Sequence, residues 1–178
     1  MTSFTAEQAQ QYVHHLLLPL LANESRITQS VLAAVPAETL DYRPDSHAKT
    51  ARELLRHIAA SDNTFLQCVL DGIFQPGAVK IPDGLDSPAQ IADWYASQHA
   101  ARLQAIREMP ADSLICILDF SGLFQRPAFF FLQIGLGHTI HHRGQLSTYL
   151  RPMGARVPAI YGESYDSAAA KNAASASA

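Results

Sequence analysis

Two histidines four residues apart, His138 and His142, are the side chains whose spacing most directly suggests chemistry in this sequence. They lie in an apolar stretch that predicts a helix from about residue 127 to residue 151. On a helix, residues four apart share one face about one turn from each other, so both imidazoles can point at one metal ion. His141 is three residues from His138 and also within reach, so spacing alone leaves two possible pairs.

A third ligand must come from another element, because a catalytic divalent metal usually takes about three protein ligands and keeps a position open for water or substrate. His57 is the best candidate. Thr50 and Glu53 form a capping-box pattern, which predicts a helix that begins at Ala51 and carries His57 near its apolar face. By helical rise, His57 lies about 10 Å after its helix start and His142 about 13 Å before the end of the other helix. In antiparallel helices these histidines meet at one level.

The remaining helical histidines are weaker candidates. His99 lies in a third predicted helix, which starts with the cap at Ser87 and runs to about residue 108. It could be a fourth ligand or a proton carrier, although a lone helical histidine is more often a surface or packed residue. The adjacent His14 and His15 point about 100° apart on a helix, so one metal ion cannot easily take both. We expect those two to be solvated or at an interface.

Residues that follow the histidine pair could orient a substrate or a ligand, namely Arg143, Gln145 and Tyr149. Arg143 is expected to point outward or toward an interface. No general base and no Ser/His/Asp arrangement is indicated, so the catalytic residues are unknown. The sequence also lacks the H-E-x-x-H motif of zinc proteases and the repeated Glu-x-x-His motif of ferritin-like di-iron sites.

The other predicted elements concern the frame of the site. Residues 5–34 predict a first helix, which Pro19 should break or kink because an interior proline removes a backbone donor and clashes with the preceding turn. Residues 112–120 predict a short strand or an irregular apolar loop. The connections are longer than the roughly 2–8 residues usual between bundle helices, so a crossover that makes neighbouring helices parallel is allowed. They are residues 35–49, 74–87 and 109–126.

Composition excludes several function classes. The chain has 178 residues, 48% of them apolar and only 16% charged, with a formal net charge of −3. Without a Lys/Arg cluster, nucleic acid is not expected as a partner. The scarcity of charge suggests that a second subunit covers part of the surface, so we expect a homodimer. Apolar stretches too short to cross a bilayer and the lack of a secretory signal predict no membrane association and a cytoplasmic location. Cys68 and Cys116, in apolar surroundings, are expected to be buried reduced thiols, with a redox or disulfide role as the alternative.

Three stretches of the chain together resemble the DinB family. They are E-L-L-R-H-I-A around His57, H-x-x-x-H-R-G-Q-L at residues 138–146, and the segment from Tyr149 to Gly162. The resemblance spans about residues 20–166 and implies a four-helix bundle with up-down-down-up topology. It also implies a divalent metal held by three histidines, which correspond here to His57, His138 and His142. The family pattern thus selects His142 over His141.

Together these observations predict an all-α fold: a four-helix bundle domain at residues 1–166 and a disordered tail at 167–178. Proteins that resemble this one include transferases that use low-molecular-weight thiols, an isomerase and many proteins without an assigned activity. The predicted function is a divalent-metal-dependent S-transferase or hydrolase for a small molecule, possibly with such a thiol as partner. The alternative is a non-catalytic, stress-related metal-binding protein. Zinc or nickel is the expected metal, with iron or manganese also allowed.

Overall fold

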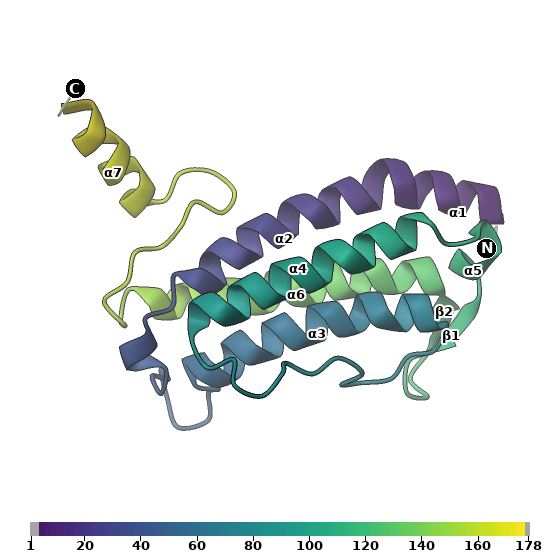
Figure 1. The fold of residues 1–178 in the computed structure, drawn as a ribbon, viewed down its shortest axis with the longest axis horizontal. Helices are drawn as coiled ribbons and strands as arrows, with labels where there is room; N and C mark the ends of the chain where they lie inside the picture. Colours follow the sequence, from purple (N-terminus) through teal and green to yellow (C-terminus); the bar gives the residue numbers. More distant parts are fainter. Residues whose placement is uncertain (1–3, 177–178) are drawn as a thin grey trace.

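The protein is mostly helical, as described over residues 4–176 of a computed structural model (Figure 1). Its main helices are α1 (Ala6–Tyr12), α2 (Leu18–Ala33), α3 (Ala51–Asp71), α4 (Pro88–Arg107) and α6 (Ala128–Leu150). The shorter elements are a π-helical turn at Val13–Leu17, a 3₁₀ turn at Ala37–Thr39, α5 (Ala111–Leu114), the strands β1 (Ile117–Asp119) and β2 (Gln125–Pro127), and α7 (Tyr165–Ala176).

The main helices lie side by side along one axis (Figure 1). Helix α2 packs against α4 and α6, and α3 packs against the same two helices. Residues 72–87, which connect α3 to α4, run back along the length of the molecule, so both helices begin at the same end. One of the long connections therefore serves as a crossover, and it also passes beside the site described below.

The predicted starts of α3 and α4 are confirmed by their capping boxes. Thr50 Oγ1 accepts the Glu53 N–H at 3.2 Å, while the Glu53 carboxylate accepts the Thr50 N–H at 2.8 Å. Ser87 and Gln90 make the same reciprocal pair at the start of α4. Each box satisfies two backbone donors that a helix start leaves free, and this fixes the residue at which the helix begins. The position of every later residue along the helix axis follows from that start.

Pro19 disturbs the first helix, as predicted. The five residues of the π-helical turn, Val13–Leu17, come just before it, and α2 starts with Pro19 in its first turn. A π-helical turn bonds over one residue more than an α-helix, as the Leu18 N–H does to the Val13 carbonyl. The helix thus widens where the proline lacks an N–H and needs room for its ring.

A small β-hairpin stands between α5 and α6. Strands β1 and β2 pair antiparallel with Leu118 opposite Arg126, and Leu118 is the buried residue of β1. The turn between them includes Ser121 and Gly122, both at positive φ. The alternative of a short strand before Ser121 is thereby confirmed, and the all-α prediction needs this correction. The hairpin positions the start of α6, because the Ala128 N–H donates to the Cys116 carbonyl at 2.8 Å.

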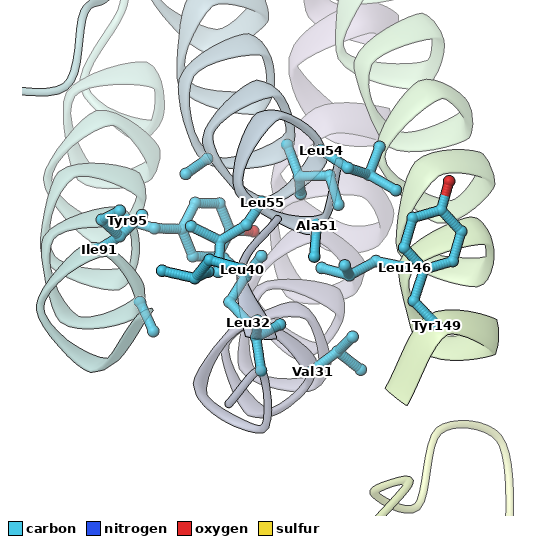
Figure 2. Close-up of a cluster of buried hydrophobic side chains, with 14 of the residues drawn as sticks. Val31, Leu32, Leu40, Ala51, Leu54, Leu55, Ile91, Tyr95, Leu146 and Tyr149 are labelled. Carbon is cyan, nitrogen blue, oxygen red and sulfur yellow. The ribbon is translucent and has the colours of Figure 1, made fainter. Parts of the chain in front are cut away.

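The core has two apolar clusters, one toward each end of the helices. The first, around Leu54, Tyr95 and Leu146, is shown in Figure 2, and the second includes Leu66 and Phe131. Buried polar residues occupy the helical turns between the two clusters: Glu24, Ser25, Thr28, Asp62, Asn63, Thr64, His99, Thr139 and Arg143. Within residues 4–176, no helix is long and apolar enough to cross a membrane.

Two features of the periphery were predicted, the tail and the two thiols. Residues of the predicted tail up to Ala176 are described as helix α7, residues 177–178 lie outside the described part, and disorder of the tail stays a prediction. Alanine is the best helix former, so an alanine-rich segment favours helix without burying a side chain, and Ser164 supports its start by accepting the Ser167 N–H. Cys68 is buried as expected, but Cys116 is exposed beside the hairpin. Both thiols are free.

Candidate metal centre

Two adjacent helices bring three histidines together. His57 comes from α3, and His138 and His142 come from neighbouring turns of α6. One ring nitrogen from each lies within 4.8 Å of the other two. The His57 and His138 Nε2 atoms are 3.3 Å apart, and the His142 ring centroid lies 4.6 Å from that of His57. The cluster is the one that the spacing, the register and the family pattern predicted.

This spacing suits a small divalent ion. Two nitrogens each bound at 2.0–2.1 Å with a tetrahedral angle between them are about 3.3–3.4 Å apart. That value agrees with the 3.3 Å between the His57 and His138 Nε2 atoms. Three imidazoles could therefore hold a metal ion here, and their donor type suits zinc, nickel, iron or copper.

A close approach of α3 and α6 makes the convergence possible. Gly135 lies one turn before His138 on α6, and a Cβ there would stand 2.7 Å from the Cβ of Phe65. That distance is shorter than atoms tolerate, so any larger residue at Gly135 would push the two helices apart. The glycine thus sets the distance between the helix that carries His57 and the helix that carries the other two histidines.

Hydrogen-bond partners hold two of the rings by their Nδ1 atoms. Ser61 Oγ lies 3.5 Å from His138 Nδ1 and donates to the His57 carbonyl at 2.6 Å. On α6, Gln145 Oε1 lies 3.1 Å from His142 Nδ1. Such outer contacts orient metal-binding histidines and leave Nε2 to the metal. Gln145 was a sequence candidate for this role, whereas Ser61 was missed; its i,i+4 spacing from His57 was the available signal.

Burial keeps two of the rings neutral. Burial, followed by the neighbouring His142 and His57, lowers the pKa of His138 to about 4, although Asp62 acts in the opposite direction. The pKa of His57 is lowered first by burial and then by His142. A neutral imidazole is the form that binds a metal. At neutral pH these two rings are already neutral, so they can bind a metal ion without first losing a proton.

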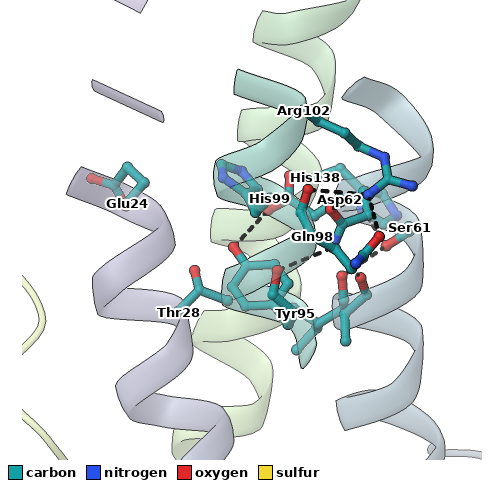
Figure 3. A network of polar contacts seen from close by, with 12 residues as sticks. Glu24, Thr28, Ser61, Asp62, Tyr95, Gln98, His99, Arg102 and His138 are labelled. Atoms are coloured by element: carbon teal, nitrogen blue, oxygen red, sulfur yellow. Dashed lines mark hydrogen bonds and ion pairs between the residues drawn. The ribbon is translucent and has the colours of Figure 1, made fainter. Parts of the chain in front are cut away.

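Two other candidate histidines are not members of the cluster. His141 is exposed, and although its ring centroid lies 4.8 Å from that of His142, it is not one of the three residues whose ring nitrogens converge. His99 is packed inside the helices, where its Nε2 lies 3.4 Å from the buried carboxylate of Asp62 (Figure 3). The Tyr95 hydroxyl donates to the same carboxylate at 2.7 Å. Of the two alternatives for His99, a ligand or a packed residue, the structure shows the packed residue, and its partner is a carboxylate.

Arg143 corrects a prediction, because it is buried rather than directed outward. Only 1% of it is exposed. Its Nη1 donates to Glu24 Oε2 at 2.6 Å and to Thr28 Oγ1 at 3.3 Å, and its Nη2 donates to the Tyr161 hydroxyl at 2.7 Å. Adjacent helical residues point about 100° apart, so a helix that presents His142 toward α3 turns Arg143 toward α2. Its partner Glu24 was missed, since a single glutamate gives no spacing signal.

Tyr149 is also buried, and its hydroxyl donates to the Lys49 carbonyl at 3.3 Å.

A cavity of about 480 Å³ opens beside the cluster. His57 and His138 form part of its wall, and three phenylalanines, Phe65, Phe74 and Phe120, form much of the rest. The size is within the range of small-molecule sites, roughly 300–1,000 Å³. A molecule in this cavity would lie directly beside two of the three histidines.

The fold and the cluster define a class: a mostly helical protein with three histidines that could hold a metal ion. The sequence profile of the DinB family matches residues 6–174. The chain therefore belongs to the DinB family, which confirms the resemblance seen in the sequence.

Individual relatives come from Bacillus. The uncharacterized protein YjoA of Bacillus subtilis (strain 168) is 27% identical over 149 residues, which cover 83% of this chain and 92% of YjoA. The uncharacterized protein YrdA of the same organism is 31% identical over 141 residues, or 78% of this chain and 82% of YrdA.

Two solved structures share the fold. The crystal structure of the DinB-like protein YjoA has a TM-score of 0.68 at 20% identity, over 83% of this chain and 99% of that one. The crystal structure of a DinB-like protein from Bacillus cereus ATCC 10987 has a TM-score of 0.66 at 27% identity, over 82% and 95% of the two chains. These similarities support the helical architecture and name no reaction.

Proposed function

We propose that this protein is a divalent-metal-dependent enzyme that transfers a thiol to a small molecule or hydrolyses one. His57, His138 and His142 are the metal ligands in this proposal. The observation that carries it is the convergence of three imidazole nitrogens within 4.8 Å of one another at the edge of an open cavity.

The chemistry follows from the donor set. A divalent ion held by neutral imidazoles keeps its full charge, and it would lower the pKa of bound water toward about 7 or stabilise a thiol as thiolate. Ser61 and Gln145 orient two of the rings, and the cavity holds the electrophile. In transfer, sulfur forms a bond to an electrophilic carbon, the leaving group departs with the bonding electron pair, and the thiol proton passes to solvent. In hydrolysis, water takes the place of the thiol.

The alternative is a metal-binding protein without turnover. A fourth protein ligand or a filled cavity would favour it. Within the described residues, the metal-capable group consists of three histidines, and the cavity beside it is open. Both observations favour the enzyme, because substrate needs a free position next to the ion.

The proposal extends to the topology, the location and the oligomeric state of the protein. The helices form an up-down-down-up four-helix bundle, supported by the crossover at residues 72–87 and by the DinB-like structures. The single domain proposed for residues 1–166, of which residues 1–3 lie outside the described part, acts in the cytoplasm, with zinc or nickel as the preferred metal. The protein is a homodimer, supported by low charge and by two apolar side chains one turn apart on the first helix, Leu16 (52% exposed) and Leu20 (38% exposed). A monomer in light scattering would contradict the dimer.

Elemental analysis tests the site. Protein purified without a chelator or affinity tag should carry close to one divalent ion per chain, and His142→Ala should lose most of it. The matched control is His141→Ala, which removes the adjacent, exposed histidine and should retain the ion. A parent protein that takes up no metal even after reconstitution would overturn the proposal. Equal loss in both variants would overturn the assignment of His142.

A further inference from the structure

We infer that the cavity beside His57 and His138 binds an uncharged aromatic small molecule, the electrophile of the proposed reaction. The inference rests on the proposed function, since it names the substrate class for that site. It is carried by the walls of the cavity rather than by the histidines.

Aromatic side chains from three elements form one side of the cavity. Phe65 is on α3, Phe74 follows that helix, and Phe120 is in the hairpin. The Phe74 and Phe120 ring centroids are 4.3 Å apart with 31° between the ring planes, and Phe65 and Phe74 are 5.7 Å apart. A flat aromatic ligand can stack or meet these rings edge-on, which adds to the gain from apolar burial.

The lining contains no Lys, Arg, Asp or Glu side chain. Away from the histidine end, where the proposed metal ion would supply the one nearby charge, a charged group would have to lose its water without an opposite charge to replace it, and such burial is costly. The carboxylates of a peptide-like thiol are therefore unsuited to the part of the cavity that the phenylalanines line. We assign the cavity to the electrophile, and a charged thiol would have to reach the histidines with its charges outside the cavity.

Two of the three hydroxyl side chains in the lining, those of Ser61 and Thr64, are bonded to the protein itself, and the third, Ser121, lies in the exposed turn of the hairpin. Ser61 donates to the His57 carbonyl at 2.6 Å. Thr64 donates to the Ala60 carbonyl at 2.9 Å and accepts the Val79 N–H at 3.2 Å. Few polar groups remain for a ligand, so its body must be apolar, and its one reactive polar group belongs at the histidine end.

Two fluorescent probes that differ by one charge test this inference. N-phenyl-1-naphthylamine is uncharged, and 8-anilinonaphthalene-1-sulfonate has the same ring system with a sulfonate. Titrated into the metal-free protein, the uncharged probe should bind about tenfold more tightly. Equal affinity, or tighter binding of the sulfonate, would overturn the inference.

Two substitutions locate the binding. Ala60→Leu fills part of the cavity and should weaken the uncharged probe about tenfold. Ala105→Leu, at a similarly half-buried helical position outside the lining, should leave it unchanged. A folded Ala60→Leu protein that binds as the parent does would show that the probe binds elsewhere, which would overturn the inference.

A charge placed at the mouth gives a second test that does not depend on Ala60. Leu123 lines the cavity and is 76% exposed, so Leu123→Lys should fold and should reduce the preference for the uncharged probe. Ile117→Lys, 61% exposed in the same hairpin but outside the lining, is the control and should keep the preference. An unchanged preference in Leu123→Lys, or the same reduction in both, would overturn the inference.

Metal content, measured on the same protein preparations before the metal is removed and again after reconstitution, separates this inference from the proposed function. If metal binds and depends on His142 while the uncharged probe binds no more tightly than the sulfonate, the enzyme proposal stands and the substrate class is wrong. If the uncharged probe binds as described but no metal is taken up, the cavity assignment is supported and the metalloenzyme is wrong.

Discussion

Two polar clusters on different faces of α6 can be compared directly, because they include adjacent residues. On one face, His138 and His142 meet His57 at the edge of a cavity. On another, Arg143 is enclosed with Glu24, and a buried arginine faces a buried carboxylate. The first cluster brings together three groups of the same kind with no counter-charge among them. The second has a donor for each acceptor.

The difference indicates that the histidine cluster is a candidate binding site, whereas the Arg143 cluster stabilises the fold. In the Arg143 cluster, the Tyr161 hydroxyl donates to Glu24 Oε2 at 2.9 Å, so the carboxylate is satisfied from two sides. Such a cluster needs no further ligand, and removing one member leaves a buried charge without a partner. The three histidines do not neutralise one another in this way, because none of them carries a charge opposite to the others. We therefore expect the two clusters to respond oppositely to mutation and to metal.

The largest effect on stability should come from Arg143→Met. The substitution leaves the Glu24 carboxylate buried without its cation, which should lower the free energy of unfolding by about 3–5 kcal/mol. Denaturant unfolding measures this. Arg151→Met is the control, since its bridge to Asp166 is exposed and should contribute at most about 1 kcal/mol. Comparable losses in the two variants would remove the contrast between a buried and an exposed ion pair.

Metal should stabilise the parent through the histidine cluster. At a free metal concentration about 100 times the dissociation constant, a single site adds about 2.7 kcal/mol to the free energy of unfolding. His57→Ala should abolish that gain while changing the metal-free protein much less, which thermal unfolding with and without metal would show. A His57→Ala protein that metal still stabilises as fully as the parent would place the ion elsewhere.

Ser61→Ala should have a smaller effect on the same site. Loss of an outer contact to a metal-binding histidine typically weakens metal affinity about 10–100-fold. Competition with a chromophoric chelator gives this number. Ser147→Ala removes a similar hydroxyl that donates to the Gly144 carbonyl on α6 and contacts no histidine, so its affinity should match the parent. Parent-like affinity in Ser61→Ala would limit that residue to packing.

The smallest effect is expected for Tyr161→Phe. The hydroxyl bonds both Arg143 and Glu24, but the residue is 65% exposed, so water can replace part of the lost contact. We expect a loss of about 0.5–1.5 kcal/mol in the free energy of unfolding and unchanged metal affinity. Tyr165→Phe, 80% exposed in the same segment, should change neither. A change in metal affinity for Tyr161→Phe would mean that the two clusters of α6 are coupled.

Local signals located much of the fold and most of the candidate site. The capping boxes at Thr50 and Ser87 predicted two helix starts, because both partners of a box lie within one turn. The proline predicted the disturbed first helix for a similarly local reason. Composition was less reliable at the periphery, where apolar neighbours in the sequence predicted a buried Cys116 and the thiol is exposed.

What the sequence determined by itself was the presence of three histidines at helical positions that can share one level, since spacing and rise are properties of a single helix. The family pattern then selected His142 over His141. Tertiary structure alone decided that Gly135 lets α3 approach α6, that Arg143 finds Glu24, and that an uncharged cavity opens beside His57. Those facts join residues that are distant in the chain, and no local pattern sets the distance between them.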